Sequence, residues 1–155
     1  MTIEMTPIGR VEASRTEAKD DYWGGSESRI VLDERFGPEA LAGIEEFSHA
    51  EVIFYFDRVD ESKIVTGAWH PRGNPEWPAV GIFAQRKKER PNRIGSTVCR
   101  ILRREGRALV VGELDAIDGT PVLDIKPVIS GFLARGEIQE PAWARELMSD
   151  YWKTR

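Results

Sequence analysis

The sequence predicts a mainly β protein, a small closed or nearly closed β-barrel with short peripheral helices. Six or seven short segments alternate apolar and polar residues or are apolar throughout, and glycine and proline separate them. Only two stretches have helical spacing. Closing the sheet removes the exposed edges that so many short strands would otherwise leave. The chain lacks the strand–helix alternation and the glycine-rich first turn of a doubly wound α/β fold.

The first two strands are expected at residues 7–13 and 28–32, where apolar positions alternate with polar ones. A polar loop that contains Tyr22 and Trp23 joins them. Two aromatic side chains in an otherwise polar loop mark it for attention.

The next part of the chain holds one helix, one strand and one loop. The stretch 36–47 is expected to form a short helix, because Pro38 suits the first helical position. The apolar run 52–56 is expected to be a strand buried on both faces. Three prolines and a glycine in 69–78 predict a loop through which neither a helix nor a sheet ladder continues.

The second half is expected to be mostly strands. A strand at 79–84 is followed by a hairpin whose strands lie at 97–102 and 108–114, with a glycine-containing turn between them. The Asp-Gly pair at 118–119 marks another tight turn, and the alternating segment 122–126 follows it as a strand.

The last helix is expected at 140–152. Trp143, Leu147 and Tyr151 lie on one face at helical spacing, with Trp152 beside them. This is more aromatic surface than a short terminal helix needs to cover one small barrel, so we expect a homodimer.

Length and composition fit one domain over residues 1–155. Hydrophobic residues make up 41% of the chain and charged residues 31%, the balance of a soluble globular protein. No apolar run approaches the roughly 20 residues of a membrane span, and the start lacks a signal peptide, so we expect a cytoplasmic protein without a membrane partner. Cys99 is expected to be a buried, inert thiol. His49 and His70 are the only histidines, and no metal site is expected.

Charge is distributed unevenly. The segment 86–107 carries nine Lys and Arg residues against Glu89 and Glu105, a net charge of +7, whereas the whole chain has −4 and the remainder therefore −11. Such segregation can direct a polyanion to one place on a mostly acidic protein. A solvated hairpin with outward arginines explains the same pattern equally well.

The segment 81–95 carries polar groups suited to binding an anion. Arg86 is expected at a strand end, where a guanidinium can clamp a carboxylate or phosphate, and Arg90 and Asn92 lie in a loop stiffened by Pro91. From composition alone, a surface turn accounts for these residues.

The segment 114–127 places Asp115, Asp118, Asp124 and Lys126 around one Asp-Gly turn. Aspartates of this kind can cap the turn or pair with a neighbouring cation. Composition does not decide between such structural roles and a chemical one.

Both segments resemble the signatures of the TsaA-like (TrmO-type) family, which read Phe-Ala-Thr-Arg, Arg-Pro-Asn-Pro-Ile-Gly and Asp-Gly-Thr-Pro-Val-x-Asp-Ile-Lys-Pro. In this chain the corresponding residues are 83–86, 90–95 and 118–127, in the same order. The resemblance begins at Pro7 and ends at Pro127, and so covers about four fifths of the chain.

The resemblance implies a β-barrel that binds S-adenosylmethionine, generally as a homodimer. It implies methylation of the exocyclic nitrogen of threonylcarbamoyl-modified adenosine 37 in tRNA. The implied cofactor-binding residues are Asp21, Tyr22, Trp23, Asp57, Arg58, Arg86, Ser96, Gly112, Glu113, Leu114 and Asp115. Together with the basic segment, it points to Arg90, Asn92, Arg93, Arg100, Arg103, Arg104 and Lys126 as residues that bind the RNA substrate.

Methyl transfer to nitrogen is an in-line displacement, in which alignment of the reacting atoms can supply most of the acceleration. An activated nucleophile on the protein is unnecessary, which agrees with the lack of a Ser-His-Asp or Cys-His arrangement. A base can still accept the proton that the attacking nitrogen loses, and Asp124 and Asp118 are the candidates.

The chain departs from the family pattern at three positions. Gln85 stands in place of threonine, Arg93 in place of the second proline, and Val128 in place of an aromatic residue, commonly tyrosine. If that aromatic residue contacts the substrate, its loss puts the substrate in doubt while leaving the cofactor site intact. A small-molecule methyltransferase and a non-catalytic S-adenosylmethionine-binding module therefore remain as alternatives.

Overall fold

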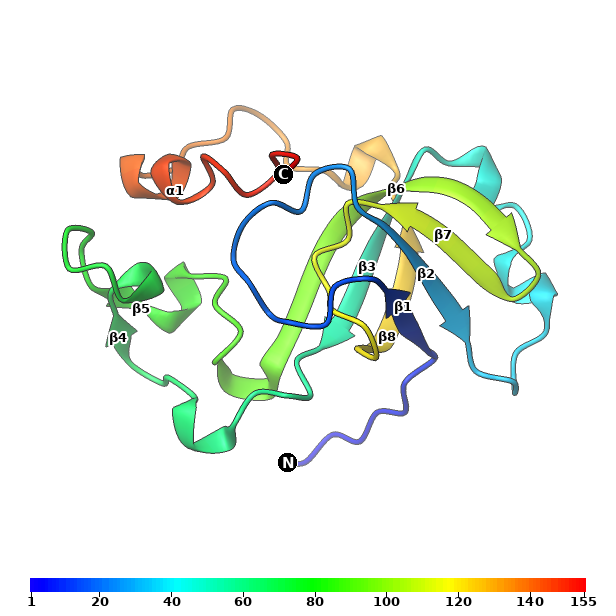
Figure 1. Ribbon diagram of the computed structural model, residues 1–155, viewed down its shortest axis with the longest axis horizontal. Coiled ribbons are helices and arrows are strands. Elements are labelled where there is room, and N and C mark those ends of the chain that lie inside the picture. Colours follow the sequence, from blue (N-terminus) through cyan, green and yellow to red (C-terminus); the bar gives the residue numbers. More distant parts are fainter. The chain divides into compact units, whose positions relative to one another are not determined.

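The computed structural model describes all 155 residues and contains a closed barrel of six strands in the order β1-β2-β7-β6-β3-β8 (Figure 1). The prediction of a mainly β barrel is confirmed. The barrel strands are β1 (Gly9–Ala13), β2 (Glu27–Leu32), β3 (His49–Tyr55), β6 (Ile94–Glu105), β7 (Ala108–Gly112) and β8 (Pro121–Pro127). The chain forms two compact units, one of residues Met1–Phe54 with Ser96–Arg155 and one of residues Tyr55–Gly95.

Strand β7 is buried along its whole length. Leu109 and Val111 contribute to the core, whereas Val110 lies directly opposite Arg29 of β2 and Arg103 of β6 on the outer face. Arginine stems can cover apolar surface while their charged heads stay in water. This arrangement accounts for the complete burial of Val110.

Strand β3 corrects one prediction, because it is not buried on both faces. Ala50, Val52 and Phe54 are buried, but the residues between them are partly exposed. The strand pairs with β8 along an antiparallel register, and antiparallel strands commonly have one face toward the core and one toward solvent.

The stretch 36–47 is not one helix. It forms two short 3-10 helices, Pro38–Leu41 and Ile44–Glu46, and Gly43 between them has a left-handed φ of 85°. A left-handed residue breaks the helical path, so the turn changes direction there. Pro38 does begin the first of them, as expected.

In the smaller unit the predicted strand at 79–84 is cut short. Strand β5 (Val80–Gly81) pairs with β4 (Ala68–Trp69), and a 3-10 helix occupies Ile82–Ala84. The side-chain amide of the buried Gln85 donates to the carbonyls of Trp69 (2.7 Å) and Val80 (2.9 Å), and so holds the two short strands together. The other 3-10 helices are Glu61–Lys63, Pro71–Gly73, Pro91–Arg93 and Ser130–Phe132.

The C-terminal helix is much shorter than predicted. Helix α1 covers only Ala142–Leu147, and the chain continues in turns. Ser149 and Asp150 follow it, residue types that compete with helical hydrogen bonding. Beyond the helix, the N–H groups of Ser149 and Tyr151 donate to the carbonyls three residues before them, so the chain turns, and Figure 1 shows the C-terminus beside the blue loop between β1 and β2.

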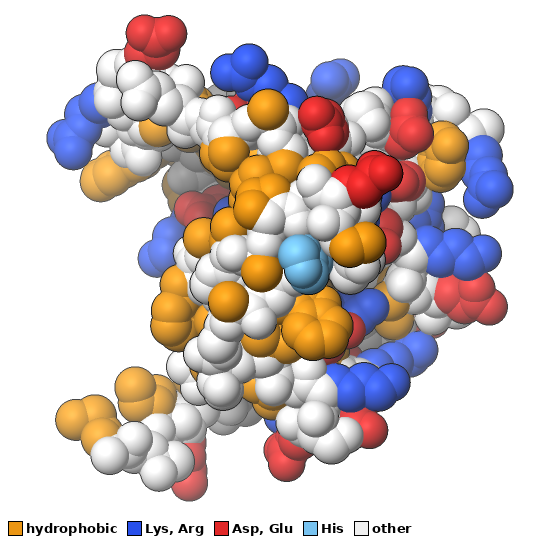
Figure 2. Space-filling view, turned by 90° about the vertical axis from the view of Figure 1, so that its left-hand side faces the viewer, with side chains coloured by type: hydrophobic (Ala, Val, Ile, Leu, Met, Phe, Trp, Pro, Cys, Tyr) orange, Lys and Arg blue, Asp and Glu red, His pale blue; other side chains and the backbone are white.

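Several hydrophobic side chains remain at the surface. Phe132 and Phe83 are the most exposed aromatic residues, at 88% and 79%. Figure 2 shows hydrophobic side chains gathered around a histidine on one face. None of the helices has the length and apolar character needed to cross a lipid bilayer.

Candidate functional site

Three segments of the larger unit meet at one place: the loop 21–26, the residues 112–115 at the end of β7, and the C-terminal residues 150–155. The backbone N–H of Glu113 donates to the carbonyl of Ser26 (2.9 Å), which joins the first two. Most of the cofactor-binding residues that the resemblance implies in this unit lie in these segments.

The C-terminal segment is attached to the loop by backbone hydrogen bonds. The N–H groups of Tyr22, Trp23 and Gly24 donate to the carbonyls of Asp150 (3.2 Å), Tyr151 (2.8 Å) and Lys153 (3.2 Å). These bonds satisfy the polar backbone of a loop that has no strand partner, and they attach it to the C-terminal segment.

Asp115 is held by two hydroxyl groups. Thr97 of β6 donates to one carboxylate oxygen, and Tyr151 of the C-terminal segment donates to the other. The carboxylate is half-buried between the fully buried Leu114 and the buried Ala116. Its plane is therefore fixed by contacts from two distant parts of the sequence.

Trp23 belongs to the core rather than to an open surface. It is 4% exposed, and the guanidinium carbon of Arg15 lies 3.7 Å from its ring centre. Arg15 also donates to the carbonyls of Asp21 (3.1 Å) and Tyr22 (2.6 Å). The indole N–H of Trp23 is buried without a hydrogen-bond partner, which is rare in folded proteins.

Tyr22 is half-exposed and has a left-handed φ of 66°. The guanidinium carbon of Arg155 lies 5.1 Å from its ring centre. A cavity of about 460 Å³ opens beside this ring. Its lining residues are Ser14, Arg15, Thr16, Glu17, Lys19, Asp20, Asp21, Tyr22 and Arg155.

The other implied cofactor residues of the larger unit are Ser96, Gly112 and Glu113. Ser96 is half-buried on β6, and Gly112 ends β7. Glu113 has a left-handed φ of 63°, and its carboxylate accepts from the N–H of Gly25 (3.4 Å). The loop and the residues after β7 are thus linked by side chain as well as backbone.

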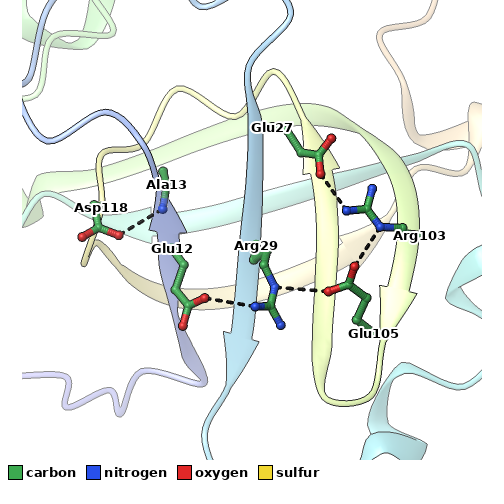
Figure 3. Close-up of polar contacts among 7 residues, drawn as sticks. All are labelled: Glu12, Ala13, Glu27, Arg29, Arg103, Glu105 and Asp118. Atoms are coloured by element: carbon green, nitrogen blue, oxygen red, sulfur yellow. Dashed lines mark hydrogen bonds and ion pairs between the residues drawn. The ribbon is translucent and has the colours of Figure 1, made fainter.

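The two candidate bases have different surroundings. Asp118 lies in the predicted tight turn and accepts from the backbone N–H of Ala13 (3.0 Å), as Figure 3 shows. Asp124 lies on β8 opposite Ile53, with one oxygen on the N–H of Ile125 and the other 3.3 Å from Lys126. The structure does not bring these two carboxylates together.

Arg103 belongs to an ion-pair network on the outside of the barrel (Figure 3). Its guanidinium donates to Glu27 and Glu105, both at 2.8 Å. Arg29 contacts Glu105 and Glu12, both at 3.4 Å. The hydrogen bond from Arg103 lowers the pKa of Glu105, and the bonds to Glu105 and Glu27 raise the pKa of Arg103.

A β-bulge in β6 lies between Arg100 and Arg104, two further arginines that are predicted to bind RNA. It lies between Ile101 and Arg103, and after it Arg104 pairs with the inward Leu109 and its guanidinium lies 4.0 Å from Glu45. A bulge shifts the alternation of side chains by one residue. The sequence predicts that the hairpin displays Arg100, Arg103 and Arg104 together, but of these three only Arg100 is exposed without a carboxylate partner.

In the smaller unit, Asp57 and Arg58 form an exposed turn after β3, and Arg86 is exposed after the buried Gln85. Arg90 binds its own loop, because its guanidinium donates to the carbonyls of Gln85 (2.6 Å) and Lys87 (3.4 Å). The cofactor roles implied for the first three residues stay predictions.

Arg93, which replaces a proline of the family motif, has a structural role in this unit. Its guanidinium donates to the carbonyl of Val59 (3.0 Å), lies 4.8 Å from the ring centre of Tyr55 and contacts Glu61 at 3.6 Å. The neighbouring Asn92 is exposed with a left-handed φ of 64°. A proline at position 93 would be incompatible with the positive φ of 49° found there.

Sequence reasoning missed Tyr151, Thr97 and Arg15. In the sequence, Tyr151 belongs to an apolar helical stripe and Thr97 to an alternating strand segment. The hydrogen bond from Tyr151 to Asp115 joins a tyrosine outside the family motifs to an aspartate within the motif-bearing part of the chain. No spacing rule predicts a contact between residues so far apart in sequence.

Comparison with known proteins finds relatives of this chain. A protein of Pyrococcus abyssi named "Probable S-adenosyl-L-methionine-binding protein" is 34% identical over 139 residues, which cover 86% of this chain and 72% of that protein. The tRNA (adenine(37)-N6)-methyltransferase of Escherichia coli is 35% identical over 99 residues, covering 59% of this chain and 40% of that enzyme.

A crystal structure of TrmO from Pseudomonas aeruginosa superposes with a TM-score of 0.74 at 29% identity. The match covers 92% of this chain and 62% of that one, so this chain spans less than two thirds of that protein's length. The sequence model of the tRNA-methyltransferase O N-terminal domain matches residues 17–132, about three quarters of the chain. By this match, and by the strand order and motifs that accompany it, the chain belongs to the tRNA-methyltransferase O N-terminal domain family.

Proposed function

We propose that this protein is an S-adenosylmethionine-dependent methyltransferase that acts on adenosine 37 of tRNA. The observation that carries the proposal is family membership over residues 17–132 together with the contact between two of the implied cofactor segments, the loop 21–26 and residues 112–115. The finer part of the proposal is the acceptor, the exocyclic nitrogen of the threonylcarbamoyl-modified form of that adenosine. The relatives named as tRNA methyltransferases support the reaction class.

The residues of the larger unit fit the cofactor. Asp115 offers a fixed carboxylate to hydroxyl groups, and Trp23 offers a buried donor that binds nothing within the protein. Asp21 and Tyr22 of the implied set line a cavity of about 460 Å³, which is within the range of about 300 to 1,000 Å³ typical of small-molecule sites; Asp115 and Trp23 do not line it. S-adenosylmethionine supplies an electrophilic methyl group when bound.

The protein contributes by orientation rather than by a nucleophile. The backbone bonds of Tyr22 and Trp23 to the C-terminal segment hold the loop rigid, which favours a fixed geometry between cofactor and acceptor. Asp118 and Asp124 stay the predicted bases. The side chain of Asp124 is 49% exposed.

We also propose a homodimer and a cytoplasmic location. Tyr151 does not support the dimer as expected, because its hydroxyl binds Asp115. Exposed apolar residues support it instead, among them Phe132 and Leu133 after β8. The location follows from the proposed substrate, since tRNA is modified there.

Methyl transfer to tRNA tests the proposal. The protein is incubated with S-adenosylmethionine labelled in its methyl group and bulk tRNA from a strain that lacks the corresponding methylation, and the nucleosides are separated. Label on the threonylcarbamoyl-modified adenosine supports the proposal. An unmodified transcript of the same tRNA is the control, and it should stay unlabelled.

A second candidate is a methyltransferase for a small molecule. The observation that favours it is the state of the basic segment, where Arg103, Arg104 and Arg93 are already paired with carboxylates. The absence of the family's aromatic residue at Val128 points the same way. Cofactor binding without any labelled nucleoside would favour this candidate, and failure to bind the cofactor would contradict both.

A further inference from the structure

The C-terminal segment 150–155 lies outside the residues that match the family, 17–132, yet it contacts the candidate cofactor loop directly. The approach is close at Gly24, where an added Cβ would lie 2.0 Å from the carbonyl oxygen of Trp152. Only glycine fits this backbone-to-backbone contact. The segment is therefore docked on the loop by the fold of this chain.

One side chain of this segment reaches the candidate site itself. The hydroxyl of Tyr151 donates to one oxygen of Asp115, and the hydroxyl of Thr97 donates to the other. A carboxylate oxygen has two lone pairs, so each oxygen can accept one further hydrogen bond. The two hydroxyls fix the orientation in which those acceptors face a ligand.

We propose that Tyr151 is a positioning residue for cofactor binding, whose hydroxyl orients Asp115 to accept the paired hydroxyls of the cofactor's ribose. The inference rests on the proposed function, because the ribose belongs to S-adenosylmethionine. Acidic side chains bind ribose hydroxyls in other nucleotide sites. Two adjacent hydroxyls on one sugar match a carboxylate with one acceptor position on each oxygen.

A purely structural role for Tyr151 makes a different prediction. If the hydroxyl only anchors the C-terminal segment, its loss weakens every ligand of the site by the same factor. If it orients Asp115, its loss weakens only ligands that carry the ribose hydroxyls. A comparison of two ligands separates these roles.

The experiment measures by calorimetry the binding of S-adenosylhomocysteine and of its 2′-deoxyribose analogue to the full chain. The wild-type protein should bind the analogue about tenfold more weakly, the loss of one hydrogen bond to a charged group. Tyr151→Phe should bind S-adenosylhomocysteine about tenfold more weakly than the wild type does. Its affinity for the deoxy analogue should change less than about threefold, so that the preference for the hydroxyl disappears.

Two further variants keep the test sharp. Thr97→Val removes the other hydroxyl donor without touching the C-terminal segment and should also reduce the preference. Tyr55→Phe removes a tyrosine hydroxyl elsewhere in the chain and should leave both affinities unchanged. Hydrogen exchange of the Trp23 amide, which binds the Tyr151 carbonyl, reports whether the segment stays docked in each variant.

The outcomes separate this inference from the proposed function. If the wild-type protein binds and Tyr151→Phe has the same affinities, the positioning role is overturned and the proposed function stands. The same holds if Tyr151→Phe binds both ligands more weakly by the same factor. A wild-type protein that binds neither ligand overturns the proposed function and the positioning role with it.

Discussion

Burial determines the chemistry of the single cysteine. Cys99 is 2% exposed on β6, and loss of solvation, with the negative charge of Asp115 as the second cause, raises its pKa from 9.0 to about 12. The thiolate is the reactive form, so alkylation of the native protein at pH 8 should be about a thousandfold slower than that of a free thiol. Labelling with iodoacetamide, with and without denaturant, measures this.

The same shift has a consequence for stability. The pKa of Cys99 is higher in the folded state than in the unfolded state, so the unfolded chain loses its proton first as pH rises. The protonated thiol of Cys99 therefore contributes to the free energy of unfolding below about pH 9, and this contribution is lost between pH 9 and 12. Rapid labelling of the native protein at pH 8 would contradict the buried state that both the sequence and the structure give to this residue.

The roles of the aspartates show what residue-level reasoning can and cannot predict. The sequence places Asp115, Asp118 and Asp124 around one turn, and the turn itself is confirmed. The three differ in their hydrogen-bond donors: two hydroxyls, the backbone of Ala13, and the backbone of Ile125 with Lys126 beside it. Three of these five partners, Thr97, Tyr151 and Ala13, come from distant parts of the sequence, and only folding brings them within reach.

At the scale of elements, the link between the loop and the C-terminal segment depends on one glycine. A Cβ at position 24 would lie 2.0 Å from the Trp152 carbonyl oxygen and 2.8 Å from its carbon, and backbone atoms cannot move aside cheaply. Gly24→Ala should lower the free energy of unfolding by about 1–3 kcal/mol. It should also increase hydrogen exchange at the Trp23 amide. Urea unfolding and exchange mass spectrometry measure the two effects.

Gly131→Ala is the matched control for this prediction. A Cβ at position 131 has no atom within 4 Å, and that residue has no positive φ. The control should unfold like the wild type. If Gly24→Ala also does, the close contact seen between the loop and the C-terminal segment does not contribute to stability.

Elements that depend on alternation were predictable, and those that depend on distant contacts were not. The hairpin of β6 and β7 and the strand β8 lie where apolar alternation places them. The long helix expected at 140–152 ends at Leu147, and the chain beyond it forms turns whose carbonyls accept from the loop near Tyr22. Helical spacing in a sequence cannot reveal that distant contact. The same holds for the bulge that separates Arg100 from Arg104.

At the scale of the whole molecule, the charge available for nucleic acid is smaller than the sequence suggests. Five of the nine cations in the segment 86–107 contact carboxylates in the structure. They are Lys87, Lys88, Arg93, Arg103 and Arg104. Of the other four, Arg86 also has a partner, whereas Arg90, Arg100 and Arg107 contact no carboxylate. An arginine already neutralised by a carboxylate releases few counterions when RNA binds.

This count predicts a shallow salt dependence for tRNA binding. Three cations without a carboxylate partner give a slope of log K against log salt of about −2 to −3, whereas nine give about −6 to −8. Arg100→Ala should make the slope less steep by nearly one. Arg103→Ala should leave it almost unchanged, because its two carboxylate partners already compensate its charge. Filter binding of tRNA at several salt concentrations measures all three slopes. A slope near −7 for the wild type would mean that the ion pairs open and the whole basic segment faces RNA. No tRNA binding at any salt concentration would leave the small-molecule substrate as the better reading of this acidic barrel.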